Sequence, residues 1–444
     1  MKVTAHLDVD MVAVETTDRI SLMVDLTAPI NDAQKTRPGQ AVQVVLDRSG
    51  SMSGDRLQAA KFSIMKLIDR LAPQDSFGLV AFDDQALVIA PMRTMADHDL
   101  PSLRKVVREM QTGGSTDLSA GYLMGLRELE RANTNNGATL ILISDGHANQ
   151  GIQDPKALAD VATKSSTNKV TTSTIGIGDG YDERILEALA QGGGGQHRFA
   201  AKIDEAVGAI AAEVNDLLEK SAVNALLRVT PVPGLATPKI EILQRLPFWM
   251  DNETYVVQLG DLFAGENRRF LIDFEVPGMA ALGLCKIADI TLEYLNLEQM
   301  TEISVTMPVQ VNIVPADIAA GRAIDPIVAA ERLVLTAQSE KAAAIEELNK
   351  GNATKAASRL KSTAENLRTR ASQIPVTDER SAESLQIIRS EADEIDQLAI
   401  YAETEDIQFA NKRTTESFSR NSRSRKLRNQ DINSDITDIE DFLS

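Results

Sequence analysis

The first part of the chain alternates apolar and polar residues in two stretches, residues 3–9 and 20–26. A period of two places every second side chain on the same face of a sheet, so each stretch is expected to form a half-buried strand. Residues 1–37 are therefore predicted to supply two strands, with a turn or linker over residues 31–39. Such a pair is not stable alone and needs further strands to pair with.

The pattern changes between residues 38 and 220, where short apolar runs alternate with helical patterns. The runs predicted to be buried strands are AVQVVLD, SFGLVAF, ATLILIS and VTTSTIGIG. The helical patterns cover residues 54–72, 100–110, 118–132, 154–166, 181–191 and 202–220. Strands that alternate with helices indicate a mostly parallel sheet covered on both faces, a doubly wound, Rossmann-like α/β domain. Ligands of such domains bind at the carboxyl ends of the strands.

Strand patterns return in residues 221–315, divided by proline and glycine turns. About ninety residues of this kind are typical of an antiparallel β-sandwich. The two N-terminal strands would find partners in this later sheet. We therefore expect the α/β domain to be inserted in a β-sandwich.

Helical periodicity dominates residues 316–410, with Gly351 and Pro375 as the breaks between helices. This region is predicted to be a helical hairpin followed by one further helix. Residues 411–444 carry a basic Ser/Arg block and then an acidic cluster, a composition typical of a disordered tail. A kinase is one candidate partner of that tail, through the serines Ser417, Ser419, Ser422 and Ser424.

Charge and cysteine content narrow the classes of function. The 444 residues include 46 basic and 64 acidic side chains, a net charge of −18. An acidic surface repels nucleic acid and anionic membranes, so neither is expected as a partner. The N-terminus lacks a signal-peptide pattern, no stretch is apolar enough for membrane insertion, and Cys285 is the single cysteine. These features together favour a cytoplasmic protein.

One loop stands out chemically. Asp47, Ser49 and Ser51 directly follow the apolar run AVQVVL, so three side-chain oxygens gather in one short loop at the end of a strand. Oxygen ligands select a hard cation, with Mg²⁺ first and Mn²⁺ or Ca²⁺ as alternatives. Aspartate and serine are also common turn formers, so this loop alone is weak evidence for a metal site.

Two further segments strengthen the metal hypothesis. Thr116 lies in the loop Gly-Gly-Ser-Thr-Asp before a predicted helix, where Asp117 has an alternative role as the helix N-cap. Asp145 follows the buried run ATLILIS and is preceded by Ser144. Each of the three segments lies at the end or the start of a predicted strand or helix, and the combination in this order is hard to obtain by chance.

In these motifs the chain resembles the von Willebrand factor A domain family, over about residues 38–218. The resemblance implies a metal-ion-dependent adhesion site. It implies that Ser49, Ser51 and Thr116 bind the cation through their hydroxyls, and that Asp47 and Asp145 act mostly through bound water. The layout of the flanking segments is similar to that of bacterial chloride-channel-like members and of inter-alpha-trypsin inhibitor heavy chains.

A cation with few negative ligands keeps an open position that favours an anionic oxygen. We therefore expect a non-enzymatic binding or scaffold protein that captures an Asp or Glu carboxylate of a partner. One alternative is a subunit that works with a separate AAA ATPase of the MoxR or chelatase kind. A second alternative, a metal-dependent hydrolase, lacks a general base near the motif.

Overall fold

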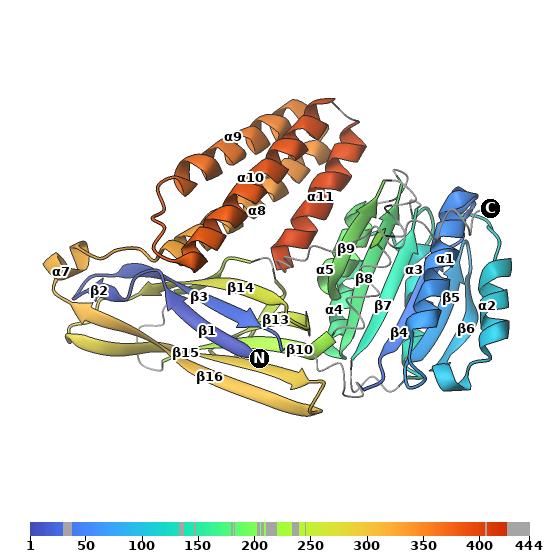
Figure 1. Ribbon diagram of the computed structural model, residues 1–444, viewed down its shortest axis with the longest axis horizontal. Helices are drawn as coiled ribbons and strands as arrows, with labels where there is room; N and C mark the ends of the chain where they lie inside the picture. Colours follow the sequence, from blue (N-terminus) through green and yellow to red (C-terminus); the bar gives the residue numbers. More distant parts are fainter. Residues whose placement is uncertain are drawn as a thin grey trace.

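The computed structural model describes residues 1–29, 38–132, 137–145, 148–178, 181, 183–201, 205, 208–209, 220–232, 239–244, 246–404 and 406–423. Figure 1 shows three parts: an α/β domain, a pair of β-sheets and a group of C-terminal helices. The helix expected over residues 202–220 lies mostly outside the described residues. Within the described ranges, no helix is long and apolar enough to cross a membrane.

The α/β domain has a central mixed sheet with the order β6-β5-β4-β7-β8-β9, in which β6 is antiparallel to β5 and the other neighbours are parallel. Its strands are β4 (Ala41–Asp47), β5 (Ser76–Phe82), β6 (Ala86–Thr94), β7 (Ala138–Ser144), β8 (Val170–Ile177) and β9 (Gly194–Ala200). This confirms the predicted α/β class. The sequence patterns missed β6 and β9, which form the two edges.

Helices cover both faces of this sheet, as strands with continuous burial require. They are α1 (Asp55–Arg70), α2 (Leu100–Glu109), α3 (Leu118–Leu129), α4 (Pro155–Thr167) and α5 (Glu183–Gly192). Alternate residues of β4 serve the two faces: Val44 packs in one core with α1 and α2, and Val45 packs in the other with α3, α4 and α5.

The remaining strands form two further sheets, with the orders β1-β3-β14-β11 and β12-β13-β10-β15-β16-β2. Their bounds are β1 (Lys2–Leu7), β2 (Met11–Ala13), β3 (Asp18–Thr27), β10 (Lys220–Pro231), β11 (Lys239–Ile242), β12 (Phe248–Asp251), β13 (Thr254–Phe263), β14 (Asn267–Val276), β15 (Gly283–Asn296) and β16 (Thr301–Val314). Apolar side chains of both sheets form one hydrophobic cluster. The N-terminal strands pair with later ones, β3 with β14 and β2 with β16, so the α/β domain interrupts this unit in sequence.

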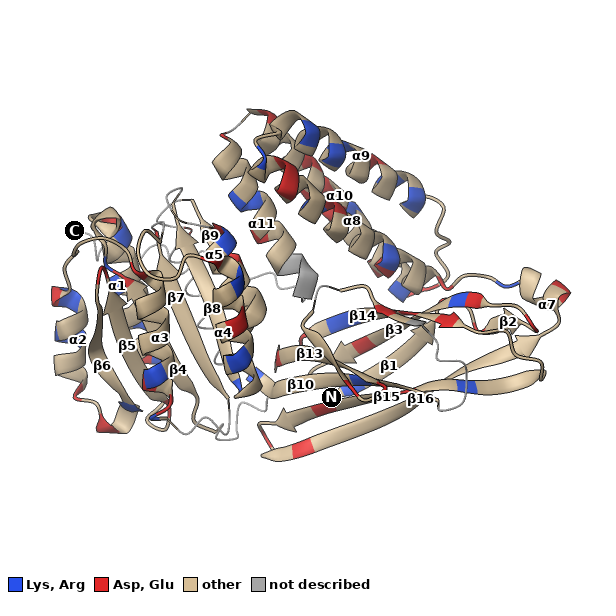
Figure 2. Cartoon of the chain, turned by 180° about the vertical axis from the view of Figure 1, so that it is seen from behind, with Lys and Arg blue, Asp and Glu red and all other residues tan. Residues whose placement is uncertain are grey.

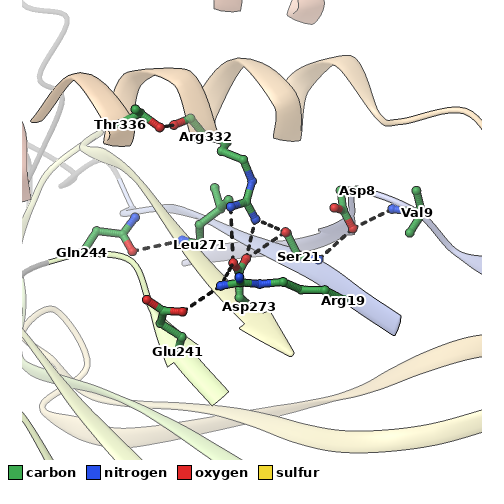
Figure 3. Close-up of polar contacts among 10 residues, drawn as sticks. All are labelled: Asp8, Val9, Arg19, Ser21, Glu241, Gln244, Leu271, Asp273, Arg332 and Thr336. Atoms are coloured by element: carbon green, nitrogen blue, oxygen red, sulfur yellow. Dashed lines mark hydrogen bonds and ion pairs between the residues drawn. The ribbon is translucent and has the colours of Figure 1, made fainter. Parts of the chain in front are cut away.

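The C-terminal helices are α7 (Ala316–Ala320), α8 (Pro326–Asn349), α9 (Ala353–Ala371), α10 (Glu379–Thr404) and α11 (Ile407–Arg423). Aliphatic residues of α8, α9 and α10 share one core, to which α11 adds Ala410. Helix α8 is also held to the four-stranded sheet, because Arg332 pairs with Asp273 of β14, whose carboxylate accepts the hydroxyl of Ser21 at 2.8 Å (Figure 3).

The prediction of a disordered tail from residue 411 is wrong for residues 411–423, which belong to α11. This helix lies between the other C-terminal helices and β9 (Figures 1 and 2). Its polar side chains Asn411, Thr414 and Ser417 are buried there. Composition predicted disorder because α11 has few apolar residues, whereas burial and hydrogen bonding between two folded parts stabilise it. Residues 424–444, including Ser424, lie outside the described residues.

Candidate metal centre

The proposed site begins where β4 ends. The carboxylate of Asp47 is fully buried and accepts the backbone N–H of Ser49 at 2.7 Å. Its second oxygen accepts the hydroxyl of Ser144, the last residue of β7, at 2.6 Å. These bonds fix the turn after β4 to the neighbouring parallel strand.

A chain of hydrogen bonds links the serines to the second aspartate. The hydroxyl oxygens of Ser49 and Ser51 lie 3.0 Å apart, and Ser51 donates to Oδ1 of Asp145 at 2.8 Å. Because the Ser51 proton points at a carboxylate, Ser49 is the donor between the two hydroxyls, and one lone pair of the Ser51 oxygen remains available to a cation. Residues 94 positions apart in the sequence thus meet at one end of the sheet.

Thr116 joins this group through the backbone of its loop. Gly50 donates to the carbonyl of Gly114 at 3.0 Å, and Gly113 donates to the carbonyl of Arg48 at 2.7 Å. The backbone N–H of Thr116 donates to Oδ1 of Asn149 at 3.0 Å, and its side chain is buried. These bonds hold the loop of Thr116 against the loop that carries the serines.

Asp117 is the N-cap of α3, which is the alternative role considered for it in the sequence. Its carboxylate accepts the backbone N–H of Ala120 at 2.9 Å and so caps α3. The cap fixes the start of the helix directly after Thr116.

The neighbouring Asp83 is paired with Arg48 at 2.7 Å, which ties the loop after β5 to the loop after β4.

Burial dominates the electrostatics at Asp47. It raises the pKa of this carboxyl, and the hydroxyl of Ser144 and the backbone N–H of Ser49 act in the opposite direction. The charge of Asp145 raises the pKa further. The donors to Asp47 are uncharged, and burial outweighs their effect on its pKa.

One contact of the site, between Arg56 and Asp145, has no signal in the amino-acid sequence. Nη1 of Arg56, in the first turn of α1, lies 2.6 Å from Oδ2 of Asp145, a residue 89 positions away. An arginine in an amphipathic helix has the pattern of a solvated residue. Its pairing with Asp145 depends on how α1 crosses the sheet, which periodicity does not encode.

The donor set suits a hard cation held largely by hydroxyls and water. Over the described ranges, no group of three or more His, Cys, Asp or Glu side chains is placed to hold a metal ion. Asp47, Ser49, Ser51 and Asp145 nevertheless form one hydrogen-bonded group, with the loop of Thr116 against it. Such a group offers oxygen ligands, the type that Mg²⁺ prefers alongside its retained waters.

Comparison with known proteins assigns the α/β domain to a family. Residues 42–213 match the von Willebrand factor type A domain. The protein sll0103 of Synechocystis sp. is 27% identical over 283 residues, which are 61% of this chain and 66% of that protein. YfbK of Escherichia coli is 25% identical over 272 residues, 59% of this chain and 46% of that protein. Human inter-alpha-trypsin inhibitor heavy chain H4 is 27% identical over 164 residues, 35% of this chain and 18% of that one.

Two solved structures match almost the whole chain. The von Willebrand factor type A protein from Catenulispora acidiphila has a TM-score of 0.72 and 16% identity, with 96% of this chain and 97% of that chain covered. The ArnB paralog VWA2 from Sulfolobus acidocaldarius has a TM-score of 0.61 and 14% identity, covering 96% and 99%. At these identities the likeness concerns the fold. By contrast, the chain covers less than two thirds of each curated relative named above.

Proposed function

Since this chain carries a von Willebrand factor type A domain, we propose that it binds a divalent cation, Mg²⁺ first, at the carboxyl ends of β4 and β7. Ser49, Ser51 and Thr116 would bind the cation through hydroxyl oxygens, and Asp47 and Asp145 through water. The observation that carries the proposal is the hydrogen-bonded group in which Ser51 bridges Ser49 and Asp145. These atoms come from separate strands and converge where parallel sheets bind ligands.

The cation would serve as an anchor for a protein partner. Neutral hydroxyls and water leave its charge largely uncompensated, so a carboxylate from outside the chain completes the coordination. The chain would thus act as a non-enzymatic binding module whose partner offers an Asp or Glu side chain. Metal and partner are then expected to bind cooperatively, each raising the affinity for the other.

The test is a calorimetric titration of Mg²⁺ and Mn²⁺ into the full chain and into the variant Asp47→Ala/Thr116→Ala. We expect binding to the unaltered chain and none to the variant, with Asp317→Ala, an exposed carboxylate on α7, as the matched control. A carboxylate-bearing partner would then be recovered in Mg²⁺ but not in chelator. Equal metal binding by the double variant would contradict the proposed site.

A further inference from the structure

The guanidinium of Arg56 occupies a specific place beside the proposed site. Nη1 lies 2.6 Å from Oδ2 of Asp145 and 3.4 Å from the backbone carbonyl of Ser51. Both of these residues belong to the group that would hold the cation. The Asp145 side chain is fully buried, whereas that of Arg56 is 38% exposed. The arginine therefore reaches inward from the rim and has a path back to solvent.

The backbone at the end of β8 makes room for this guanidinium. Gly178 has φ +71°, and a Cβ atom placed on it would lie 2.9 Å from Nη2 of Arg56 and 3.1 Å from Cζ. A larger side chain at this position would overlap with the arginine. The guanidinium thus lies at the carboxyl ends of the strands, where β4 and β7 carry residues of the proposed site.

We infer that Arg56 is an internal competitor of the divalent cation, which exchanges with it as the positive charge beside Asp145. The inference rests on the proposed function and goes beyond it by assigning a residue that sets metal affinity. One oxygen of Asp145 binds the Ser51 hydroxyl and the other binds Arg56. A cation on the serine hydroxyls would lie close to the guanidinium, and like charges at a partly buried site repel strongly. The partial exposure of the Arg56 side chain allows it to turn outward as the cation enters.

The opposite role is also chemically reasonable, and it predicts the opposite sign. If Arg56 only positioned Asp145, removal of the guanidinium would loosen that carboxylate and weaken metal binding. If Arg56 competes, its removal eliminates a repulsive charge and leaves Asp145 free to hold metal-bound water. The direction of the change in metal affinity therefore separates the two roles.

The experiment compares Mn²⁺ dissociation constants of the full chain, Arg56→Gln and Arg56→Lys at constant ionic strength. We expect Arg56→Gln to bind Mn²⁺ on the order of tenfold more tightly, and Arg56→Lys, which keeps the charge, to bind less tightly than Arg56→Gln. The control is Lys105→Gln, which removes a charge from an exposed pair on α2 and should not change the affinity. Unchanged or weaker binding by Arg56→Gln would overturn the inference and leave the proposed function intact. No binding by any of these proteins would refute the proposed function and the inference with it.

A second measurement needs no variant. An arginine-specific dicarbonyl reagent, read out by peptide mass spectrometry, should modify Arg56 faster in Mn²⁺ than in chelator, because the displaced guanidinium faces solvent. Arg104, which pairs with Asp69 at the surface, serves as the internal reference. An unchanged or slower rate at Arg56 in saturating Mn²⁺ would also overturn the inference.

Discussion

The ammonium of Lys220 lies 2.5 Å from Oδ2 of Asp261, and both side chains are almost fully buried. Lys220 begins β10 and Asp261 lies on β13, while the same ammonium donates to Thr139 of β7 at 2.7 Å. Burial by itself would raise the pKa of Asp261, but the neighbouring charge of Lys220 and the hydroxyl of Thr171 lower it below the usual value. The hydrogen bonds of this pair to Thr139 of β7 and Thr171 of β8 join the α/β domain to the sheet that contains β10 and β13.

Removing one partner of this buried pair should destabilise the chain. Lys220→Met leaves an unpaired buried carboxylate, and we expect the free energy of unfolding in urea to fall by about 3–5 kcal/mol. The double variant Lys220→Met/Asp261→Leu should recover most of this loss. The control, Lys286→Met, removes a surface pair with Asp289 and should cost less than about 1 kcal/mol. A loss at Lys220 no larger than at Lys286 would contradict the assigned role.

Helix α11 offers a matched pair of threonines for testing its packing. The Thr415 hydroxyl is buried and has no hydrogen-bond partner among the described residues, whereas the Thr414 hydroxyl donates to the carbonyl of Ala410 at 2.7 Å. Thr415→Val should raise the free energy of unfolding by about 1 kcal/mol, because an unsatisfied polar group is replaced by a methyl. Thr414→Val should not stabilise the chain. Equal effects of the two substitutions, measured by chemical denaturation, would show that α11 is not packed as described.

Stability should fall on mild acidification because of His197. This residue is buried beneath α11, and burial, with a smaller contribution from the charge of Lys412, lowers its pKa to about 3. Below about pH 6.5 the unfolded chain gains a proton there that the folded chain does not, so stability declines as the pH falls towards 3. At pH 5 the loss is about 2 kcal/mol relative to pH 7.

Denaturation curves at pH 7 and pH 5 measure this loss. The variant His197→Gln removes the titrating group, so its pH dependence should be smaller than that of the unaltered chain. His98→Gln is the control, since His98 is only partly buried. If His197→Gln kept the full pH dependence, the decline would have to come from other groups.

The loop that holds Thr116 requires a glycine at position 113. A Cβ atom there would lie 1.8 Å from Oδ2 of Asp83, a carboxylate that is already fixed by Arg48. Gly113→Ala should therefore displace the loop and weaken Mn²⁺ binding by about 10- to 100-fold. Gly321→Ala, whose Cβ would meet the nearest atom at 3.6 Å, is the control and should bind normally. Unaltered affinity in Gly113→Ala would argue against a metal role for this loop.

Sequence periodicity determined the class of each large segment. Buried strands such as β4 and β7 have continuous apolar runs, and amphipathic helices have their own period, so the α/β domain was predictable from local patterns. The positions of Asp47 and Asp145 directly after such runs then placed both at the same edge, because parallel strands end together. For that reason Asp47 and Asp145 could be predicted as site residues from the sequence alone.

Tertiary packing decided what local patterns do not encode. Strand β6 contains Pro91, which a sheet edge tolerates. Strand β9 begins in a glycine run that resembles a turn, but a Cβ atom on Gly195 would lie 2.1 Å from the carbonyl oxygen of Thr172, so close strand packing requires glycine there. Helix α11 is stabilised by burial rather than composition, and Arg56 meets Asp145 across 89 positions. These features depend on contacts between segments that are far apart in the sequence, and such contacts form only when the chain folds.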